Sequence, residues 1–318
     1  MKSLRPVLYL CGAAAVLVCL YVAGLFPAGL SASEQLAADW EASYGSRAKV
    51  DDDGRVLQLT IRSADFADAD CARLTSMPDL ESLDLSGTSI TNDSLATLAQ
   101  LKSLRTLKLS GTVVTDAGLA ALAEAPALED LSLARCPLDT LTESGVGQLV
   151  SLTSLDLMDT QITDDAGAAL SKLTNLQKLY VGRTKISSSI LPALTDLKKI
   201  QLLNVAELPV TAAGDMEAIA SLPALELLYL DRSDLTDEAF QRMIAALCSH
   251  ESCVVSAMFL EGCAISDASQ EALLDLVQLS SMSKLRLTGT QVSREVFNEL
   301  VKTSPEISFA HGSGQSED

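Results

Sequence analysis

A short sequence pattern that recurs at a fixed spacing is the strongest constraint on the fold of this chain. The segments LESLDLSGTSITNDSLATLAQL, LRTLKLSGTVVTDAGLAALAEA and LTSLDLMDTQITDDAGAALSKL share the pattern L-x-x-L-x-L-x-x-T-x-I/V-T-[DN]. Its first apolar position recurs every 24 residues and then after 25, 30 and 27, at Val56, Leu80, Leu104, Leu128, Leu152, Leu176, Ile200, Leu225, Val255 and Met282. These ten positions predict a stacked repeat domain over residues 56–305.

Each repeat is expected to contain a short strand, a turn and a helix. The leucines of L-x-L lie two residues apart, so they share one face of a strand while the residues between them share the other. A Thr-Asp pair then predicts a helix N-cap with negative charge in the first turn, at Thr115–Asp116, Thr163–Asp164 and Thr236–Asp237. One repeat cannot bury its leucines alone, so neighbouring repeats must stack to close a core.

The pattern resembles the leucine-rich repeat family over nearly all of the chain after its first thirty residues. The resemblance implies an α/β solenoid, curved, of about ten strand–turn–helix units. Many members carry asparagine after the strand, but here that place holds Thr88, Thr112, Cys136, Thr160, Thr184, Leu208, Ser233, Cys263 and Thr290. A hydroxyl satisfies fewer backbone groups than an amide. The pattern is closer to threonine- or cysteine-bearing repeats, such as those in F-box-associated and some bacterial proteins.

Residues 1–33 predict a membrane segment. Val7 to Phe26 is an apolar run of twenty residues, which is about the length a helix needs to cross a bilayer. Lys2 and Arg5 precede it, so the positive-inside rule keeps the N-terminus cytoplasmic and exports the remainder. A single-pass anchor is one interpretation. Cleavage near the small residues from Ala28 onward, which would release a secreted protein, is a second, and a buried core helix is a third.

The repeats are expected to begin and end with short flanking segments. Residues 34–55 predict an N-terminal cap, in which an amphipathic helix places Trp40 over the open end of the solenoid. A strand and a turn at Asp53–Gly54 then lead into the first repeat. Residues 306–318 are expected to form a C-terminal tail, whose polar part from His311 to Asp318 is predicted to be disordered.

Charge and motifs exclude several function classes. The chain has 23 basic and 42 acidic residues, a formal charge of −19, and such a field repels nucleic acid. No G-x-S-x-G, H-E-x-x-H or P-loop pattern occurs. We therefore expect a non-enzymatic protein without a cofactor.

Five cysteines lie outside the predicted membrane segment. Cys71, Cys136 and Cys263 occupy repeat positions of small core residues. Cys248 and Cys253 flank the insertion CSHESC, where a disulfide or two free thiols are the main alternatives. A metal site with His250 is a weaker one, since no fourth ligand is evident and the spacing matches no common zinc motif.

The strand positions between the leucines predict a binding surface. In the leucine-rich repeat family, which the pattern resembles, these positions line the concave face, and that face serves as a platform for protein contact. Toward the C-terminus they become apolar and aromatic, at Tyr180, Leu202, Leu227, Tyr229 and Phe259. Aromatic residues are only 4% of this chain, and they are typical contact anchors. Alternatively, another segment of the chain folds over the strip, or strand propensity alone selected these residues.

The expected function is therefore protein–protein interaction. An exported leucine-rich repeat protein would bind an envelope or surface partner through its concave face. The main alternative is a structural or self-associating envelope scaffold without a discrete ligand. A third, an enzyme built around the loop between Cys248 and Cys253, has the least support from the sequence.

Overall fold

The computed structural model describes residues 30–209, 218–249 and 253–312. The chain divides into two compact bodies, an N-terminal body of residues 1–137 and a C-terminal body of residues 138–318. The predicted membrane segment, Val7 to Phe26, lies outside the described residues. Among the residues that are described, none of the helices combines the length and apolar character needed to cross a bilayer.

The N-terminal body begins with the predicted cap. Helix α2 (Ala32–Tyr44) starts at a capping box formed by Ser31 and Glu34. Trp40 is buried, and its ring meets that of Phe66 edge-on at 5.5 Å between centroids. Strand β1 (Arg47–Val50) runs antiparallel to β2 (Val56–Thr60). The helix and the strand expected in residues 34–55 are thus both present, with the helix starting two residues earlier.

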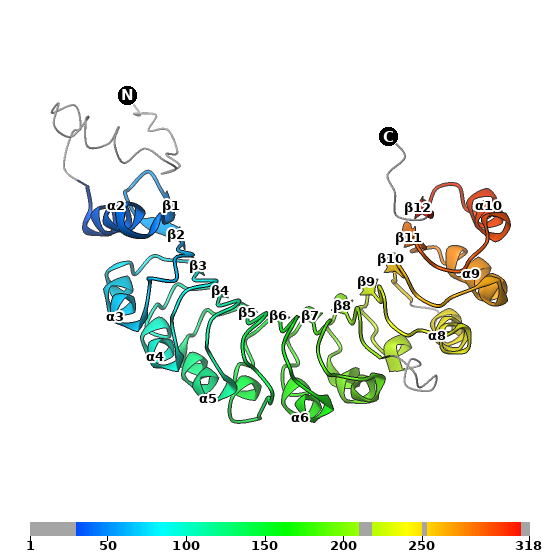
Figure 1. Ribbon diagram of the computed structural model, residues 1–318, viewed down its shortest axis with the longest axis horizontal. Coiled ribbons are helices and arrows are strands. Elements are labelled where there is room, and N and C mark those ends of the chain that lie inside the picture. Colours follow the sequence, from blue (N-terminus) through cyan, green and yellow to red (C-terminus); the bar gives the residue numbers. More distant parts are fainter. Residues whose placement is uncertain (1–29, 210–217, 250–252, 313–318) are drawn as a thin grey trace. The chain divides into compact units, whose positions relative to one another are not determined.

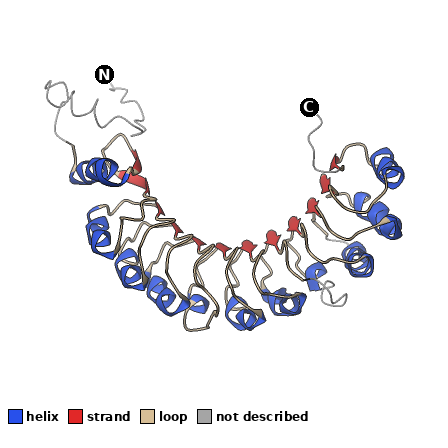
Figure 2. Ribbon diagram, viewed as in Figure 1, coloured by secondary structure: helices blue, strands red, loops and turns tan. Residues whose placement is uncertain are grey.

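Parallel strands continue from β2 through the N-terminal body. They are β3 (Ser82–Asp84), β4 (Thr106–Lys108) and β5 (Asp130–Ser132), each paired with the one before it. Short helical turns connect them on the opposite side, as Figure 2 shows for this body. These are α3 (Asp68–Cys71), η1 (Ala72–Ser76), η2 (Asn92–Ser94), α4 (Leu95–Leu98), α5 (Asp116–Leu119) and η3 (Ala120–Glu124).

The C-terminal body repeats the same arrangement with longer helices. Its strands are β6 (Ser154–Asp156), β7 (Lys178–Tyr180), β8 (Leu202–Asn204), β9 (Leu227–Tyr229), β10 (Ala257–Phe259), β11 (Lys284–Arg286) and β12 (Ser308–Ala310). Its described helices are η4 (Val146–Gln148), η5 (Asp164–Ala166), α6 (Gly167–Leu170), η6 (Ser188–Asp196), α8 (Asp237–Ser249), η7 (Asp267–Ser269), α9 (Gln270–Val277) and α10 (Arg294–Thr303). Within this body the strands line one side and the helices the other (Figure 1).

The predicted register of the repeats is confirmed. Leu59, Leu83, Leu107 and Leu131 are paired in successive strands of the N-terminal body, and all are buried. The ten positions that defined the repeat are likewise buried. Each buried leucine contributes roughly 1.5–3 kcal/mol, so stacking of the repeats provides the core.

Hydroxyls in the usual asparagine position bond within their own turn. Thr88 Oγ1 donates to Leu85 O at 2.7 Å, and Thr112, Thr160, Thr184 and Thr290 do the same in their repeats. The cysteines instead reach back to the preceding repeat. Cys136 Sγ lies 3.1 Å from Leu109 O, and Cys263 Sγ lies 3.0 Å from Leu230 O. Burial raises the pKa of Cys263 to about 11, which suits an inert core thiol.

The expectation for the Thr-Asp pairs holds only in part. Thr236 accepts a capping bond from Ala239 N, but Thr115 and Thr163 make no such bond to their helices. The following aspartate instead joins neighbouring repeats. Asp164 accepts from the backbone N of Ser187 at 2.8 Å and from its hydroxyl at 2.7 Å.

The sheet also extends beyond the ten predicted repeats. Ile307 is buried, 25 residues after Met282, and β12 pairs in parallel with β11. His311, expected in the disordered tail, stacks on Phe297 at 4.3 Å and lies 3.0 Å from Val292 O through Nε2. Residues 307–312 therefore belong to the folded domain.

Candidate protein-binding face

The outward positions of five consecutive strands form the candidate site. We call it the C-terminal strand face, made of Lys178, Tyr180, Leu202, Asn204, Leu227, Tyr229, Ala257, Phe259, Lys284 and Arg286. The strand pairings place these residues in two parallel columns, one running from Lys178 to Lys284 and the other from Tyr180 to Arg286. The columns match those expected from the sequence.

All five predicted contact residues lie on this face, but they differ in exposure. Tyr180, Leu227 and Tyr229 are half-buried, whereas Leu202 and Phe259 are only 8% and 6% exposed. Side chains on neighbouring parallel strands stand about 4.8 Å apart and shield one another. The face is therefore a smooth apolar strip with three partly exposed side chains.

Tyr229 and Phe259 form the most ordered part of the strip. Their rings are stacked, with 4.2 Å between centroids and 1° between planes. On Phe259, Lys284 Nζ lies 5.2 Å and the Arg286 guanidinium 5.4 Å from the ring centroid. Each aromatic pair of this kind adds about 0.5–1.5 kcal/mol beyond its buried area. The two rings are thus held in position by the neighbouring side chains.

A row of ion pairs borders the second column at the turns that follow the strands. Arg183 contacts Glu207 at 3.0 Å, and Arg232 lies 3.6 Å from Glu207 and 3.5 Å from Glu261. Arg183, Glu207 and Arg232 adopt φ near +60°, where glycine stands in other repeats. The charges alternate, so these pairs offset part of the backbone strain.

Asp231 lies between this row and the aromatic rings. Its partial burial, and the nearby carboxylate of Glu261, raise the pKa of this carboxyl, although it accepts a hydrogen bond from Glu261 N at 2.8 Å. The cationic Arg286 and Arg232 act in the opposite direction. Asp231 is not among the contact residues that the repeat pattern predicted. Its position directly after the aromatic strand was the one signal that could have done so.

The corresponding face of the N-terminal body is polar. At the position of Tyr229 its strands carry Thr60, Asp84, Lys108 and Ser132. Asp84 is buried, and both Nε and Nη2 of Arg62 donate to its Oδ2, at 3.1 and 2.6 Å. Burial alone would raise the pKa of Asp84, but hydrogen bonds from Ser86 and Arg62 outweigh it and lower the pKa.

Cys248 lies in helix α8, and Cys253 lies shortly before strand β10. Cys248 is exposed and Cys253 half-buried, and both are free thiols in the structure, so the disulfide between them stays a prediction. His250 is outside the described residues. Elsewhere, in the part that the structure does describe, no three metal-binding side chains come together.

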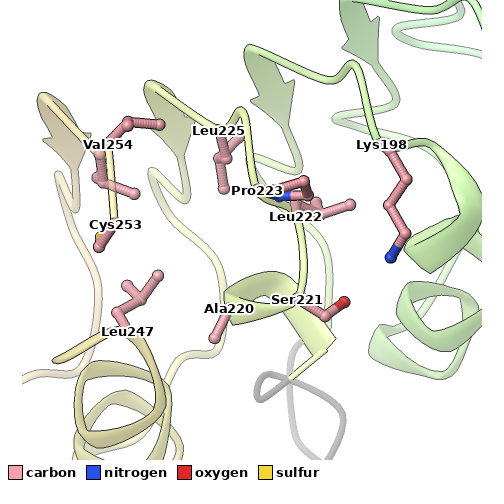
Figure 3. Close-up of a pocket in the computed structure, with 10 residues that line it drawn as sticks. Lys198, Ala220, Ser221, Leu222, Pro223, Leu225, Leu247, Cys253 and Val254 are labelled. Carbon is pink, nitrogen blue, oxygen red and sulfur yellow. The ribbon is translucent and has the colours of Figure 1, made fainter. Parts of the chain in front are cut away.

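A small apolar pocket opens beside Cys253. It has a volume of about 270 Å³ and is lined mainly by apolar side chains, among them Leu222, Leu225, Leu247 and Val254 (Figure 3). Lys198 is its one basic lining residue. Ser221 and Cys253 also belong to its lining.

Known proteins share the architecture described above. A family model described as Leucine Rich repeat matches residues 76–99, 100–123 and 148–171. The crystal structure of an internalin (inlF) from Listeria monocytogenes is similar with a TM-score of 0.55 and 17% identity, over 77% of this chain and 71% of that one.

A second internalin from the same organism, internalin C2, gives a TM-score of 0.46 and 24% identity over 56% of this chain and 72% of that one. No curated protein matches the sequence. The repeat period and the buried leucine register are similar to those of leucine-rich repeat proteins, in agreement with the three matched segments.

Proposed function

We propose that this chain is a non-enzymatic binding protein that holds another protein on its C-terminal strand face. The single observation that carries the proposal is the stacked pair Tyr229–Phe259. Interface hot spots are enriched in aromatic residues whose rings are fixed in advance, because less side-chain entropy is then lost on binding. Leu227 and Tyr180 add half-buried surface on the same face.

Export to the cell surface is the second part of the proposal. The apolar run from Val7 to Phe26, preceded by Lys2 and Arg5, supports a single-pass anchor with the repeats outside the cytoplasm. If the segment is cleaved, the repeat domain would be secreted instead. Protease added to intact cells should digest the repeats, and full protection would contradict export.

An extracytoplasmic location also favours the Cys248–Cys253 disulfide. Its closed loop is short, so the expected gain in the free energy of unfolding is about 2 kcal/mol. Intact mass measured with and without reductant, after alkylation of free thiols, should reveal one bond in protein taken from its native compartment. Alkylation of both Cys248 and Cys253 in the unreduced sample, located by peptide mapping, would rule it out.

Site-directed photo-crosslinking tests the binding face itself. A benzoylphenylalanine at position 227 places the reactive group on the strand face, and one at Val301, an exposed position of α10, is the matched control. We expect a discrete adduct with a membrane or surface protein from position 227 alone. Equal labelling from both positions would refute the site.

A separate measurement tests the alternative that the chain is a self-associating scaffold. Sedimentation of the full chain over a range of concentrations distinguishes a monomer from a self-associating protein. An adduct from position 227 that contains only a second copy of this chain would replace the proposed partner with self-association.

A further inference from the structure

Two lysines bracket the apolar part of the C-terminal strand face. In the first column Lys178, Leu202, Leu227, Ala257 and Lys284 are consecutive strand partners. Since neighbouring strands are about 4.8 Å apart, the four steps place the two lysine positions on the order of 19 Å apart along the sheet. The three residues between them are all apolar.

Neither lysine has an acidic partner among the described residues. The structure gives Lys178 no side-chain ion pair there, and Lys284 contacts only the ring of Phe259. This differs from the arginines of the turn row, where Arg183 and Arg232 are each paired with glutamates. These two ammonium groups are therefore available to a ligand.

The outward edge of the aromatic stack carries positive charge, as the lysines do. One face of each ring is covered by the other ring, because Tyr229 and Phe259 are stacked. Lys284 and Arg286 lie near the Phe259 ring as well. What Phe259 presents outward is its edge, which carries partial positive charge. Ring edges and ammonium groups both attract carboxylate and carbonyl oxygens.

The acidic neighbours do not cancel this field. Glu261 is held by Arg232 and Arg286 at 3.5 and 3.7 Å, and Asp231 accepts a bond from the backbone of Glu261. Both lie beyond the second column, on the side away from the lysines. The ten residues of the strand face contain three cations and no acid, although the whole chain carries −19.

We propose that the partner's contact segment is an acidic polypeptide, with carboxylates on both sides of an apolar stretch. The carboxylates would meet Lys178 and Lys284, and the apolar stretch would cover Leu202, Leu227 and the Tyr229–Phe259 edge. An extended segment of about six residues spans the required distance. This inference rests on the proposed function, because it specifies the chemistry of the partner at the same face.

Nucleic acid does not match both the lysines and the apolar strip between them. Its phosphates could meet the lysines, but it has no apolar side chains for the strip, and the net charge of the chain repels a polyphosphate at a distance. The same net charge also repels an acidic polypeptide, but this repulsion is screened beyond roughly 8–10 Å in physiological salt, so the apolar half of the site is what favours a polypeptide.

The binding of labelled peptides to the full chain tests the proposal. The probe has about six apolar residues, long enough to span the strip, between paired glutamates. Two further peptides carry glutamine or lysine in place of the glutamates. Measured by fluorescence anisotropy, affinity should fall in the order glutamate, glutamine, lysine, and the preference for glutamate should shrink as salt is raised.

Matched variants assign the effect to the two lysines. Lys178→Gln and Lys284→Gln should each weaken the glutamate peptide by about threefold to fivefold, as expected for exposed ion pairs, without changing the affinity of the glutamine peptide. Lys302→Gln removes the same charge from the exposed side of α10 and should change neither affinity.

The possible outcomes separate this inference from the proposed function. Equal binding of the glutamate and glutamine peptides would overturn the acidic partner and leave the strand face as a binding site. Lysine-dependent binding of vesicles containing phosphatidylserine, without binding of the glutamate peptide, would overturn the polypeptide assignment. Failure of all peptides together with no adduct from position 227 would overturn the proposed function as well.

Discussion

The two bodies use one repeat design and present opposite chemistry on their strand faces. In the N-terminal body, the buried Asp84 carboxylate accepts two hydrogen bonds from Arg62. At the same repeat position in the C-terminal body, Phe259 is buried by stacking on Tyr229. The inward leucines are alike in both. Because alternate strand positions point away from the inward leucines, they can diverge without loss of the repeat register, and they carry what is specific to each body.

Phe259→Ala should have the largest effect on binding. Removing the ring unstacks Tyr229 and should weaken partner affinity by about 2–4 kcal/mol, as for other aromatic hot spots. Ser132→Ala, at the same position of the N-terminal body, should leave affinity unchanged. Binding of the crosslinked partner is the measurement, with chemical unfolding recorded for each variant.

Tyr229→Phe is the matched control for this substitution. It retains the stacked ring and removes only the hydroxyl, so it separates loss of the ring from general disturbance of β9. If Phe259→Ala and Ser132→Ala bind equally well, the difference between the two faces has no bearing on recognition.

Asp84→Ala should affect the N-terminal body, and it should change stability rather than partner affinity. The substitution removes the acceptor of two Arg62 bonds and of the Ser86 backbone N–H. We expect a loss of about 2 kcal/mol in the free energy of unfolding, since hydrogen bonds to a charged group are each worth about 1.5–3 kcal/mol and Arg62 is largely exposed. Partner affinity should stay within about twofold. A large loss of affinity would place part of the binding site in the N-terminal body.

The repeat pattern was sufficient to predict which residues face the core and which face outward. Leu-x-Leu has a period of two, so the register of every predicted repeat strand followed once the repeat was aligned. The last strand was missed because its apolar residues, Ile307 and Phe309, lie after Leu300, where the chain has no further leucine and the L-x-x-L-x-L pattern is absent. The spacing of 25 residues was the available signal.

The chemistry of the candidate site was less predictable than its position. The sequence placed Phe259 among exposed anchors, but burial depends on what the neighbouring side chains cover, and here Tyr229, Lys284 and Arg286 all cover the ring. Likewise, Asp164 could be assigned to a helix start, but not to Ser187 and Ser189, which lie one repeat away. Contacts between repeats require three-dimensional coordinates.

Acid should weaken both bodies through these aspartates. In Asp164 partial burial raises the pKa, but hydrogen bonds from Ser187 and Ser189 outweigh it, so the folded pKa lies below that of the unfolded chain. The stabilisation is therefore full above the unfolded pKa of about 4 and is lost as pH falls through the folded value. Asp68 in the N-terminal body is held in the same way by Ser94 and Thr91.

Urea unfolding between neutral pH and about pH 3, below the unfolded pKa, measures this loss. Asp164→Asn should remove roughly 1 kcal/mol at neutral pH and reduce the acid-induced loss, because hydrogen bonds to a carboxylate are stronger than those to an amide. Asp165→Asn, at the exposed neighbouring position, should do neither. Parallel pH curves for the two variants would mean that the inter-repeat bonds do not respond to protonation.

The smallest effect is expected in the turn after the strand, where some repeats carry glycine and others a longer side chain. Gly87 and Gly111 adopt φ near +70°, whereas Arg183 occupies the same turn position at φ 59°. Arg183→Gly relieves a left-handed conformation worth about 1–2 kcal/mol and loses exposed ion pairs worth about 0.2–1 kcal/mol each. Greater backbone freedom of glycine in the unfolded chain offsets much of the remaining gain.

We therefore expect Arg183→Gly to change the free energy of unfolding by less than about 1 kcal/mol, the sum of these opposing effects. Gly111→Arg is the reciprocal substitution. Its side chain would have free space but would have to adopt φ 69°, so it should cost about 1–2 kcal/mol. If Arg183→Gly costs as much as Gly111→Arg, the alternating charges stabilise the turns well beyond what exposed pairs provide, and the C-terminal body depends on them for its order.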